Sequence, residues 1–133
     1  MLHFLPSSGT WQIEFKTSQP DGIIMYVADV RQVDFLALYL KDGYVVYGFN
    51  LGDDPAVITS SNTYNDGQWH TVAFSRERLS GELVVDGTDQ NTGAAAGSSQ
   101  FINVQMPYYI GGVTAEVAQG GVKNLEVRIG IKL

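Results

Sequence analysis

Hydrophobic and polar residues alternate in short runs along most of the chain. Trp11, Ile13 and Phe15 alternate with polar neighbours, which predicts a strand with one apolar face toward a core. Residues 71–75 alternate in the same way. Further strands are predicted from apolar or β-branched runs at 23–28, 35–40, 44–49, 82–85, 108–110 and 122–131. No helical periodicity rises above this pattern, so strands should dominate the fold.

The run 35–40 is apolar at successive positions, which predicts a central strand that is covered on both faces. An aspartate, Asp34, stands at its head. One interpretation is a strand-end residue, because Asp is common at turns. The other is a ligand for a cation, which requires further oxygen donors nearby.

Asp-Gly pairs separate many of these runs, at 21–22, 42–43, 66–67 and 86–87. Gly accepts positive φ without steric cost and Asp bonds its own backbone, so such pairs favour tight turns. The small, polar segment Thr88 to Ser99 is expected to be a surface loop. Short strands at this spacing indicate an all-β fold, either an antiparallel sandwich or a barrel, and we expect a jelly-roll-like antiparallel β-sandwich. We expect a single domain over residues 1–133.

Composition and charge exclude several classes of partner. The net charge is −6 and only eight of the 133 residues are Lys or Arg, which argues against nucleic acid because phosphate binding needs clustered basic residues. There is no cysteine, so no disulfide or thiolate site can form. No apolar run approaches the roughly 18 residues that would suggest a membrane span, and we expect no membrane insertion.

Several strings, in order along the chain, resemble the laminin G-like domain family, which includes laminins, neurexins and sex-hormone-binding globulin. The signature string is NDGQWHTV at 65–72, which resembles the family's D-G-x-W-H-x-V. The other matching strings are FKT followed by QPDGIIMY at 15–26, DFLAL at 34–38, FNLG at 49–52, LVVDG at 83–87 and YIGGV at 109–113. The resemblance implies a concanavalin-like sandwich domain of this family over 1–133 and an extracellular location, either secreted or as an ectodomain.

Two features depart from the family pattern. Gly121 stands where the family often has a cysteine, so the usual terminal disulfide is absent. Residues 1–8 leave little room for the additional N-terminal strand that the family usually has.

The resemblance implies a calcium site at the rim of the sandwich. Its ligands would be the carboxylate of Asp34, the backbone carbonyls of Leu51 and Phe101, and the side-chain oxygen of Asn103. Oxygen donors of this kind suit Ca²⁺, and a single carboxylate implies a dissociation constant on the order of 10⁻⁴ to 10⁻³ M. The aspartates at 53–54 add negative potential. The alternative, plain turn residues, stays open.

The Trp69-His70 pair has two interpretations. It could be an aromatic sugar platform beside a catalytic histidine. More often a tryptophan after a turn fills a sandwich core, and we therefore expect Trp69 in the core, with His70 hydrogen-bonded or exposed at the start of a strand.

The resemblance implies a non-catalytic extracellular adhesion module that binds a protein receptor or an acidic glycan at its calcium-bearing rim. Heparin is less favoured as a partner because of the net negative charge. A glycan-active enzyme would need two carboxylates flanking a cleft, whereas Glu14 is isolated and Glu82 and Asp86 flank an apolar strand. We expect no enzyme, and the alternatives are a glycan-active enzyme or a hydrophobic-ligand carrier on the same sandwich.

Overall fold

The computed structural model describes residues 8–28, 34–51, 54–96, 105–110 and 126–129. Within these ranges every regular element is a strand. The ten strands are β1 (Ser8–Lys16), β2 (Gly22–Ala28), β3 (Asp34–Lys41), β4 (Tyr44–Leu51), β5 (Ala56–Thr63), β6 (Trp69–Glu77), β7 (Ser80–Val85), β8 (Asp89–Ala94), β9 (Gln105–Ile110) and β10 (Glu126–Ile129).

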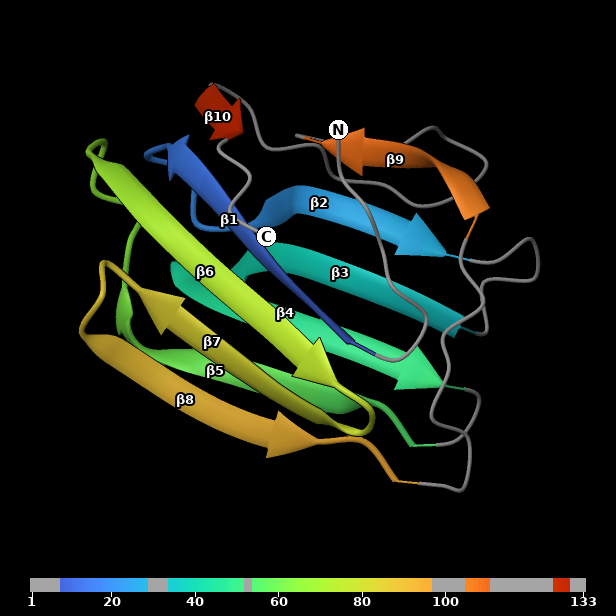
Figure 1. Cartoon of the computed structure of the whole chain (residues 1–133). Helices are drawn as coiled ribbons and strands as arrows, with labels where there is room; N and C mark the ends of the chain where they lie inside the picture. The colour runs from blue at the N-terminus through green and yellow to red at the C-terminus, as the bar shows by residue number, and fades with distance from the viewer. Residues whose placement is uncertain (1–7, 29–33, 52–53, 97–104, 111–125, 130–133) are drawn as a thin grey trace.

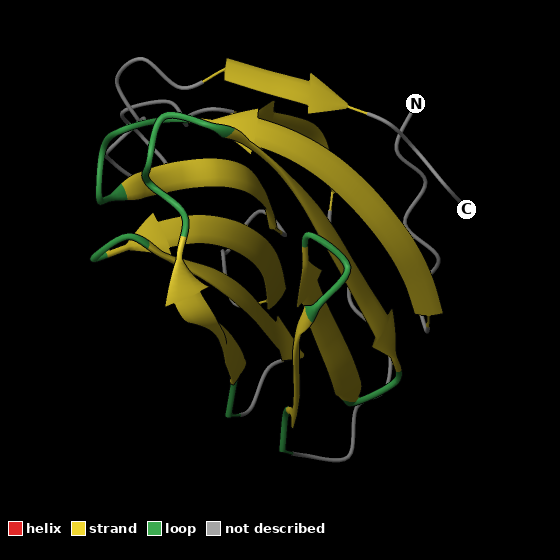
Figure 2. Ribbon diagram, turned by 90° about the vertical axis from the view of Figure 1, so that its left-hand side faces the viewer, coloured by secondary structure: helices red, strands yellow, loops and turns green. Residues whose placement is uncertain are grey.

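The described strands form two five-stranded sheets that lie as two layers (Figures 1 and 2). One sheet has the order β10-β1-β6-β7-β8 and the other has the order β5-β4-β3-β2-β9. The pairings between neighbouring strands are antiparallel, for example β1 with β6 and β3 with β4. The predicted antiparallel β-sandwich is confirmed, and β3 is the central strand of its sheet, as its apolar run predicted.

The core lies between the two sheets and is built from alternate residues of each strand. In β1, Trp11, Ile13 and Phe15 are fully buried, and the Trp11 ring stacks on Phe74 of β6 with 5.6 Å between ring centroids. Successive side chains of a strand point to opposite faces, which explains why the alternation in sequence marks the buried face. Other buried members are Leu36, Leu38, Leu40, Val45, Tyr47, Phe49, Ile58, Val72, Leu83 and Val85.

Two of the Asp-Gly pairs form the tight turns that the sequence predicts. Asp42 and Gly43 connect β3 to β4 with φ of 53° and 86°. Asp86 and Gly87 follow β7 with φ of 53° and 73°. Two successive residues with positive φ match the right-handed twist of the adjoining strands, and Asp and Gly tolerate that conformation better than most residues.

Two strands differ from the sequence prediction. The segment 88–99 was expected to be a loop, but residues 89–94 form β8, an edge strand. No strand was predicted over β5, which lies at the edge of the other sheet. The C-terminal strand was predicted over 122–131; the structure describes β10 at Glu126–Ile129, and the rest of that prediction, like Gly121, lies outside the described residues.

Candidate functional site

Asp34 and Leu51 are cross-strand partners at one end of the sandwich. Asp34 is the first residue of β3, Leu51 is the last residue of β4, and their Cα atoms are paired in the register of the two strands. The turn at 42–43 closes the other end of this hairpin. The fold therefore brings together the backbones of two of the four predicted calcium ligands.

The other two predicted ligands, Phe101 and Asn103, lie outside the described residues, as does Asp53. The described chain that leads toward them ends beside the same region, because the amide of Ala96 donates a hydrogen bond to the carbonyl of Asp54 at 3.1 Å. Asp54 itself is exposed.

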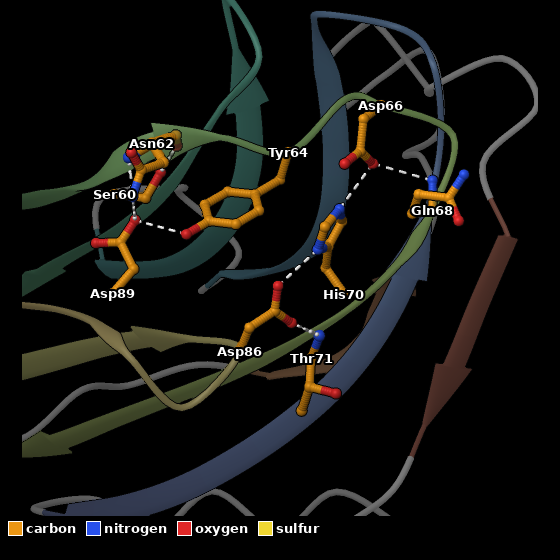
Figure 3. A network of polar contacts seen from close by, with 9 residues as sticks. All are labelled: Ser60, Asn62, Tyr64, Asp66, Gln68, His70, Thr71, Asp86 and Asp89. Carbon is orange, nitrogen blue, oxygen red and sulfur yellow. Dashed lines mark hydrogen bonds and ion pairs between the residues drawn. The ribbon is translucent and has the colours of Figure 1, made fainter.

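The opposite end of the sandwich carries a network of polar contacts around His70 (Figure 3). The amide of Tyr64 donates to the carbonyl of Gly43 at 2.8 Å, which places this network at the closed end of the β3–β4 hairpin. The Nδ1 atom of His70 lies 2.7 Å from Oδ2 of Asp86, and its Nε2 atom lies 2.8 Å from Oδ1 of Asp66. Both ring nitrogens of His70 are thus engaged by carboxylates from two different turns.

These contacts shift the ionisation of the groups involved. Burial alone would lower the pKa of His70, but the hydrogen bonds to Asp66 and Asp86 raise it above its ordinary value. The hydrogen bond to His70 lowers the pKa of Asp66. The imidazole therefore favours its charged form, in which each ring nitrogen donates a proton. Such a ring joins two turns, and neither of its nitrogens is left to act as a base.

Asp89, at the start of β8, is a buried carboxylate that accepts hydrogen bonds from the edge of the other sheet. The amide of Ser61 lies 3.0 Å from both carboxylate oxygens, and the amide of Asn62 donates to Oδ2 at 3.0 Å. The hydroxyl of Tyr64 donates to Oδ2 at 2.7 Å, and the side chain of Asn91 donates to Oδ1 at 2.8 Å. Asp89 is therefore a polar link between β5 and β8.

The pKa values of Asp89 and Tyr64 reflect the same contacts. Burial alone would raise the pKa of Asp89, but hydrogen bonds from Tyr64, Ser61 and Asn62 lower it to about 2. Burial and the hydrogen bond to Asp89 raise the pKa of Tyr64 to about 12. Asp89 is thus the ionised acceptor and Tyr64 the neutral donor over the neutral range of pH.

Trp69 does not lie in the core, and the expectation that it fills the sandwich interior is wrong. Its side chain is half-buried, and Nζ of Lys16 lies 5.7 Å from its ring centroid, within the range of a cation–π contact. Strand β6 alternates, with Val72, Phe74 and Arg76 buried, so Trp69 has the outward parity and His70 the inward parity. His70 was expected to be hydrogen-bonded or exposed, and the structure shows it hydrogen-bonded.

From the sequence, Asp66 and Asp86 were expected to be turn residues, and Asp86 was set aside as a catalytic carboxylate because it and Glu82 flank an apolar strand. The spacing of four between Asp66 and His70 could have suggested a contact, because the intervening Gly67 turns the chain back toward the strand. The contact with Asp86 follows from strand pairing: Val72 is opposite Val85, so the preceding residues of β6 approach the turn after β7. The amide of Thr71 donates to Oδ1 of Asp86 at 2.8 Å. No signal in the sequence indicated the acceptor role of Asp89.

Within the described ranges, no group of three or more His, Cys, Asp or Glu side chains could hold a metal ion. The same ranges contain no helix that is long and apolar enough to cross a membrane.

The chain is similar in sequence to a known family and to several known proteins. The sequence model of the Laminin G domain family matches residues 15–128. The chain is 39% identical over 115 residues to laminin subunit alpha-4 of Mus musculus, covering 86% of this chain and 6% of that protein. It is 36% identical over 107 residues to the basement membrane-specific heparan sulfate proteoglycan core protein of Mus musculus, covering 77% of this chain and 3% of that protein. It is 34% identical over 108 residues to neurexin 1 of Drosophila melanogaster, covering 80% of this chain and 6% of that protein.

The fold is similar to those of solved laminin structures. Domains LG4-5 of the mouse laminin alpha1 chain superpose with a TM-score of 0.81 at 23% identity, covering 98% of this chain and 35% of that one. The LG1-3 region of the laminin alpha2 chain superposes with a TM-score of 0.82 at 22% identity, covering 96% of this chain and 27% of that one. At this level of identity the likeness concerns the fold.

Proposed function

The chain belongs to the laminin G domain family, and from this premise we propose that it is a non-catalytic extracellular adhesion module whose partner binds at a calcium-bearing rim. The family membership confirms the resemblance found in the sequence. The relatives are proteins of the extracellular matrix or ectodomains, and one is named for the basement membrane. The chain spans only 3–6% of the length of these relatives, and its partner and calcium site are therefore proposals that rest on its own residues.

Asp34 would supply the carboxylate of the calcium site, Leu51 and Phe101 their backbone carbonyls, and Asn103 its side-chain oxygen. The observation that supports this set is the pairing of Asp34 with Leu51 at the open end of the β3–β4 hairpin. The hydrogen bond from Ala96 to Asp54 adds support, because it holds the chain that leads to Phe101 beside the chain that follows Leu51.

The chemistry of this donor set fits Ca²⁺. Calcium takes six to eight oxygen ligands, and carboxylate, amide and backbone carbonyl oxygens are its usual donors. One carboxylate and three neutral oxygens leave positions for water or for the oxygens of a partner. A bound ion would therefore attract an acidic group, and we propose an extracellular protein receptor or an acidic glycan as the partner. The net charge of −6 makes a sulfated glycan such as heparin less favoured.

The described residues favour an adhesion module over the two alternatives. A glycan-active enzyme needs a carboxyl group that can exchange protons near the substrate, but Asp89 is engaged by hydrogen-bond donors and both nitrogens of His70 are engaged by acids. A hydrophobic-ligand carrier needs room between the sheets, where the large side chains of Trp11, Tyr47 and Phe74 are packed against one another.

Calorimetric titration of the chelated protein with calcium tests the proposal. The wild type should bind one ion with a dissociation constant on the order of 10⁻⁴ to 10⁻³ M. Asp34→Ala should abolish binding, whereas Glu77→Ala, which removes one exposed carboxylate from the same end of the sandwich, should leave it unchanged. Magnesium should substitute poorly, because it demands a tighter octahedral shell.

A melting experiment gives a second readout. In about 10 mM calcium the wild type should gain about 1.4–2.7 kcal/mol of stability over the chelated protein, because an ion bound only by the native state stabilises it. Asp34→Ala should lose this gain and keep its stability in chelator. Identical melting of the wild type in calcium and in chelator would refute the calcium site and leave Asp34 as a strand-end residue.

A further inference from the structure

His70, Asp66 and Asp86 form a bridge between two turns, which we call the His70 bridge (Figure 3). Asp66 lies in the turn between β5 and β6, and Asp86 lies in the turn between β7 and β8. The side chain of His70 is 11% exposed, whereas those of Asp66 and Asp86 are 54% and 40% exposed. The ring is thus enclosed, and the two acids that hold it reach solvent.

The protonation state of the ring decides how many of these contacts can be hydrogen bonds. An imidazolium carries an N–H on both nitrogens, whereas neutral imidazole carries one N–H and one lone pair. With a carboxylate oxygen 2.7 Å from Nδ1 and another 2.8 Å from Nε2, only the protonated ring satisfies both. In the neutral ring one nitrogen lone pair would face a carboxylate, and that contact would become repulsive.

The two acids are not held equally well. Asp86 uses separate oxygens for its two donors: Oδ2 faces His70, and Oδ1 accepts from the amide of Thr71 at 2.8 Å. Asp66 uses the same oxygen, Oδ1, for His70 and for the amide of Gln68 at 3.0 Å. Asp66 is also the more exposed acid, and its release to water requires less rearrangement.

We propose that the His70 bridge is a pH-sensitive switch: the charged ring holds both turns, and loss of its proton releases Asp66 and loosens the β5–β6 turn while Asp86 stays in place. The released turn would include Gly67, whose amide donates to the carbonyl of Thr17, the residue that follows β1. The switch lies at the opposite end of the sandwich from Asp34 and Leu51, and it is independent of the proposed calcium site.

In the described part of the chain, the charged partners of the His70 ring are the two aspartates, Asp66 and Asp86. The ring of Tyr64 meets it edge-on with 4.9 Å between centroids, and the ring of Phe15 lies at 5.9 Å. The Tyr64 hydroxyl is directed to Asp89, and Lys16 of the adjacent strand lies over Trp69. The raised pKa of His70 agrees with this environment. The ring should therefore lose its proton, and release the turn, above the ordinary histidine pKa of about 6.5.

Nuclear magnetic resonance tests the proposal on the intact chain, with His3→Gln to leave His70 as the single histidine. The imidazole of His70 should titrate above about 6.5. Over the same pH range, hydrogen-exchange protection of the Gly67 amide, corrected for the intrinsic rate, should fall by about tenfold for each unit by which the pKa of His70 exceeds its ordinary value. The Thr71 amide, which is bonded to Asp86, should keep its protection.

Asp66→Asn and Asp42→Asn form a matched pair of variants. Both remove one exposed carboxylate from an Asp-Gly turn at this end of the sandwich, and Asp42 makes no hydrogen bond to His70. An amide at position 66 can bond either form of the ring, so Asp66→Asn should lower the pKa of His70 and remove the pH response at Gly67. Asp42→Asn should retain both. An ordinary or lowered pKa of His70 in the parent protein, constant protection at Gly67, or loss of protection at Thr71 instead would each overturn the proposal.

Discussion

The Tyr64 hydroxyl donates a 2.7 Å hydrogen bond to the buried carboxylate of Asp89, and this bond joins the edges of the two sheets. Tyr64 follows β5 and Asp89 begins β8, so the contact crosses from one layer of the sandwich to the other. Backbone amides of Ser61 and Asn62 share the same acceptor. One side chain thus satisfies several donors that the sheet ladder leaves unpaired at this edge.

Asp89→Ala should destabilise the protein by about 3 kcal/mol, because it leaves the buried hydroxyl of Tyr64 and the part-buried amides of Ser61 and Asn62 without their acceptor. Urea unfolding of the two proteins at neutral pH measures the difference. Glu82→Ala is the control: Glu82 accepts an exposed hydrogen bond from Gln90 on the outside of the same sheet, and its loss should change stability by less than about 0.5 kcal/mol. Equal effects of the two substitutions would contradict the role assigned to Asp89.

The stabilising effect of Asp89 should disappear in acid. Its pKa is about 2 in the folded protein, against about 3.9 in an unfolded chain. A depressed pKa gives a contribution that is complete above about 3.9 and is lost as the pH falls toward 2. The stability difference between wild type and Asp89→Asn should therefore shrink by about 2–3 kcal/mol between pH 5 and pH 2, measured by urea unfolding. A constant difference across this range would show that folding does not lower the pKa of Asp89.

The two tryptophans should respond very differently to truncation. Trp11 is fully buried against Phe74, and Trp11→Ala should cost about 3–5 kcal/mol through loss of burial and the cavity that remains. Trp69 is half-buried beside Lys16, and Trp69→Ala should cost about 1 kcal/mol. Denaturant unfolding followed by circular dichroism measures both without relying on tryptophan fluorescence. A larger loss for Trp69→Ala would restore the core role that the sequence suggested.

Gly81→Ala should destabilise the sandwich by about 1–3 kcal/mol through overpacking. A Cβ at position 81 would lie 2.6 Å from Cε1 of Phe49 and 3.1 Å from Cδ1 of Ile58 across the core. Gly87→Ala is the matched control, because a Cβ there meets nothing within 4 Å and only the positive φ of 73° is strained, at about 1 kcal/mol. A second substitution, Ile58→Val, should relieve part of the loss in Gly81→Ala and none of the loss in Gly87→Ala. Absence of such relief would contradict the steric explanation.

Strands β1 and β3, which the sequence predicted, have apolar residues at their buried positions. Trp11, Ile13 and Phe15 give β1 a clear period of two, and β3 is apolar on both faces because it is central. Strand β8 has no such signal, because its more buried positions hold Asp89, Asn91 and Gly93. Hydrogen bonds to Asp89 and the space at Gly93, where a Cβ would meet Ile58 at 2.8 Å, take the place of apolar side chains there. Such a strand is recognisable only once its partner is known.

The candidate sites likewise combine contacts that the sequence predicts with contacts that depend on the fold. Asp34 pairs with Leu51 because β3 and β4 form a hairpin around the turn Asp42-Gly43. Two predicted strands on either side of this Asp-Gly pair are enough to predict the pairing. The sequence predicted His70 at the start of a strand, with Trp69 before it in the core. Strand β6 instead begins at Trp69, and the alternation that buries Val72 and Phe74 turns His70 inward and Trp69 outward. The contact of His70 with Asp86 depends on the register of β6 against β7, which is a tertiary relationship.

The strand order also governs how the chain must assemble. Strand β1 pairs with β10 through Ile13 and Ile129, and β2 pairs with β9 through Tyr26 and Tyr109. The pairing of β1 and β2 therefore cannot be completed until β9 and β10, which come last in the chain, are available. Contacts between such distant segments close large loops, and they slow folding. During synthesis the outer edges of β1 and β2 would stay open after their other neighbours have paired. A chain truncated before Gln105 would keep both edges open permanently, and each would be a template on which a second chain could add a strand and start an aggregate.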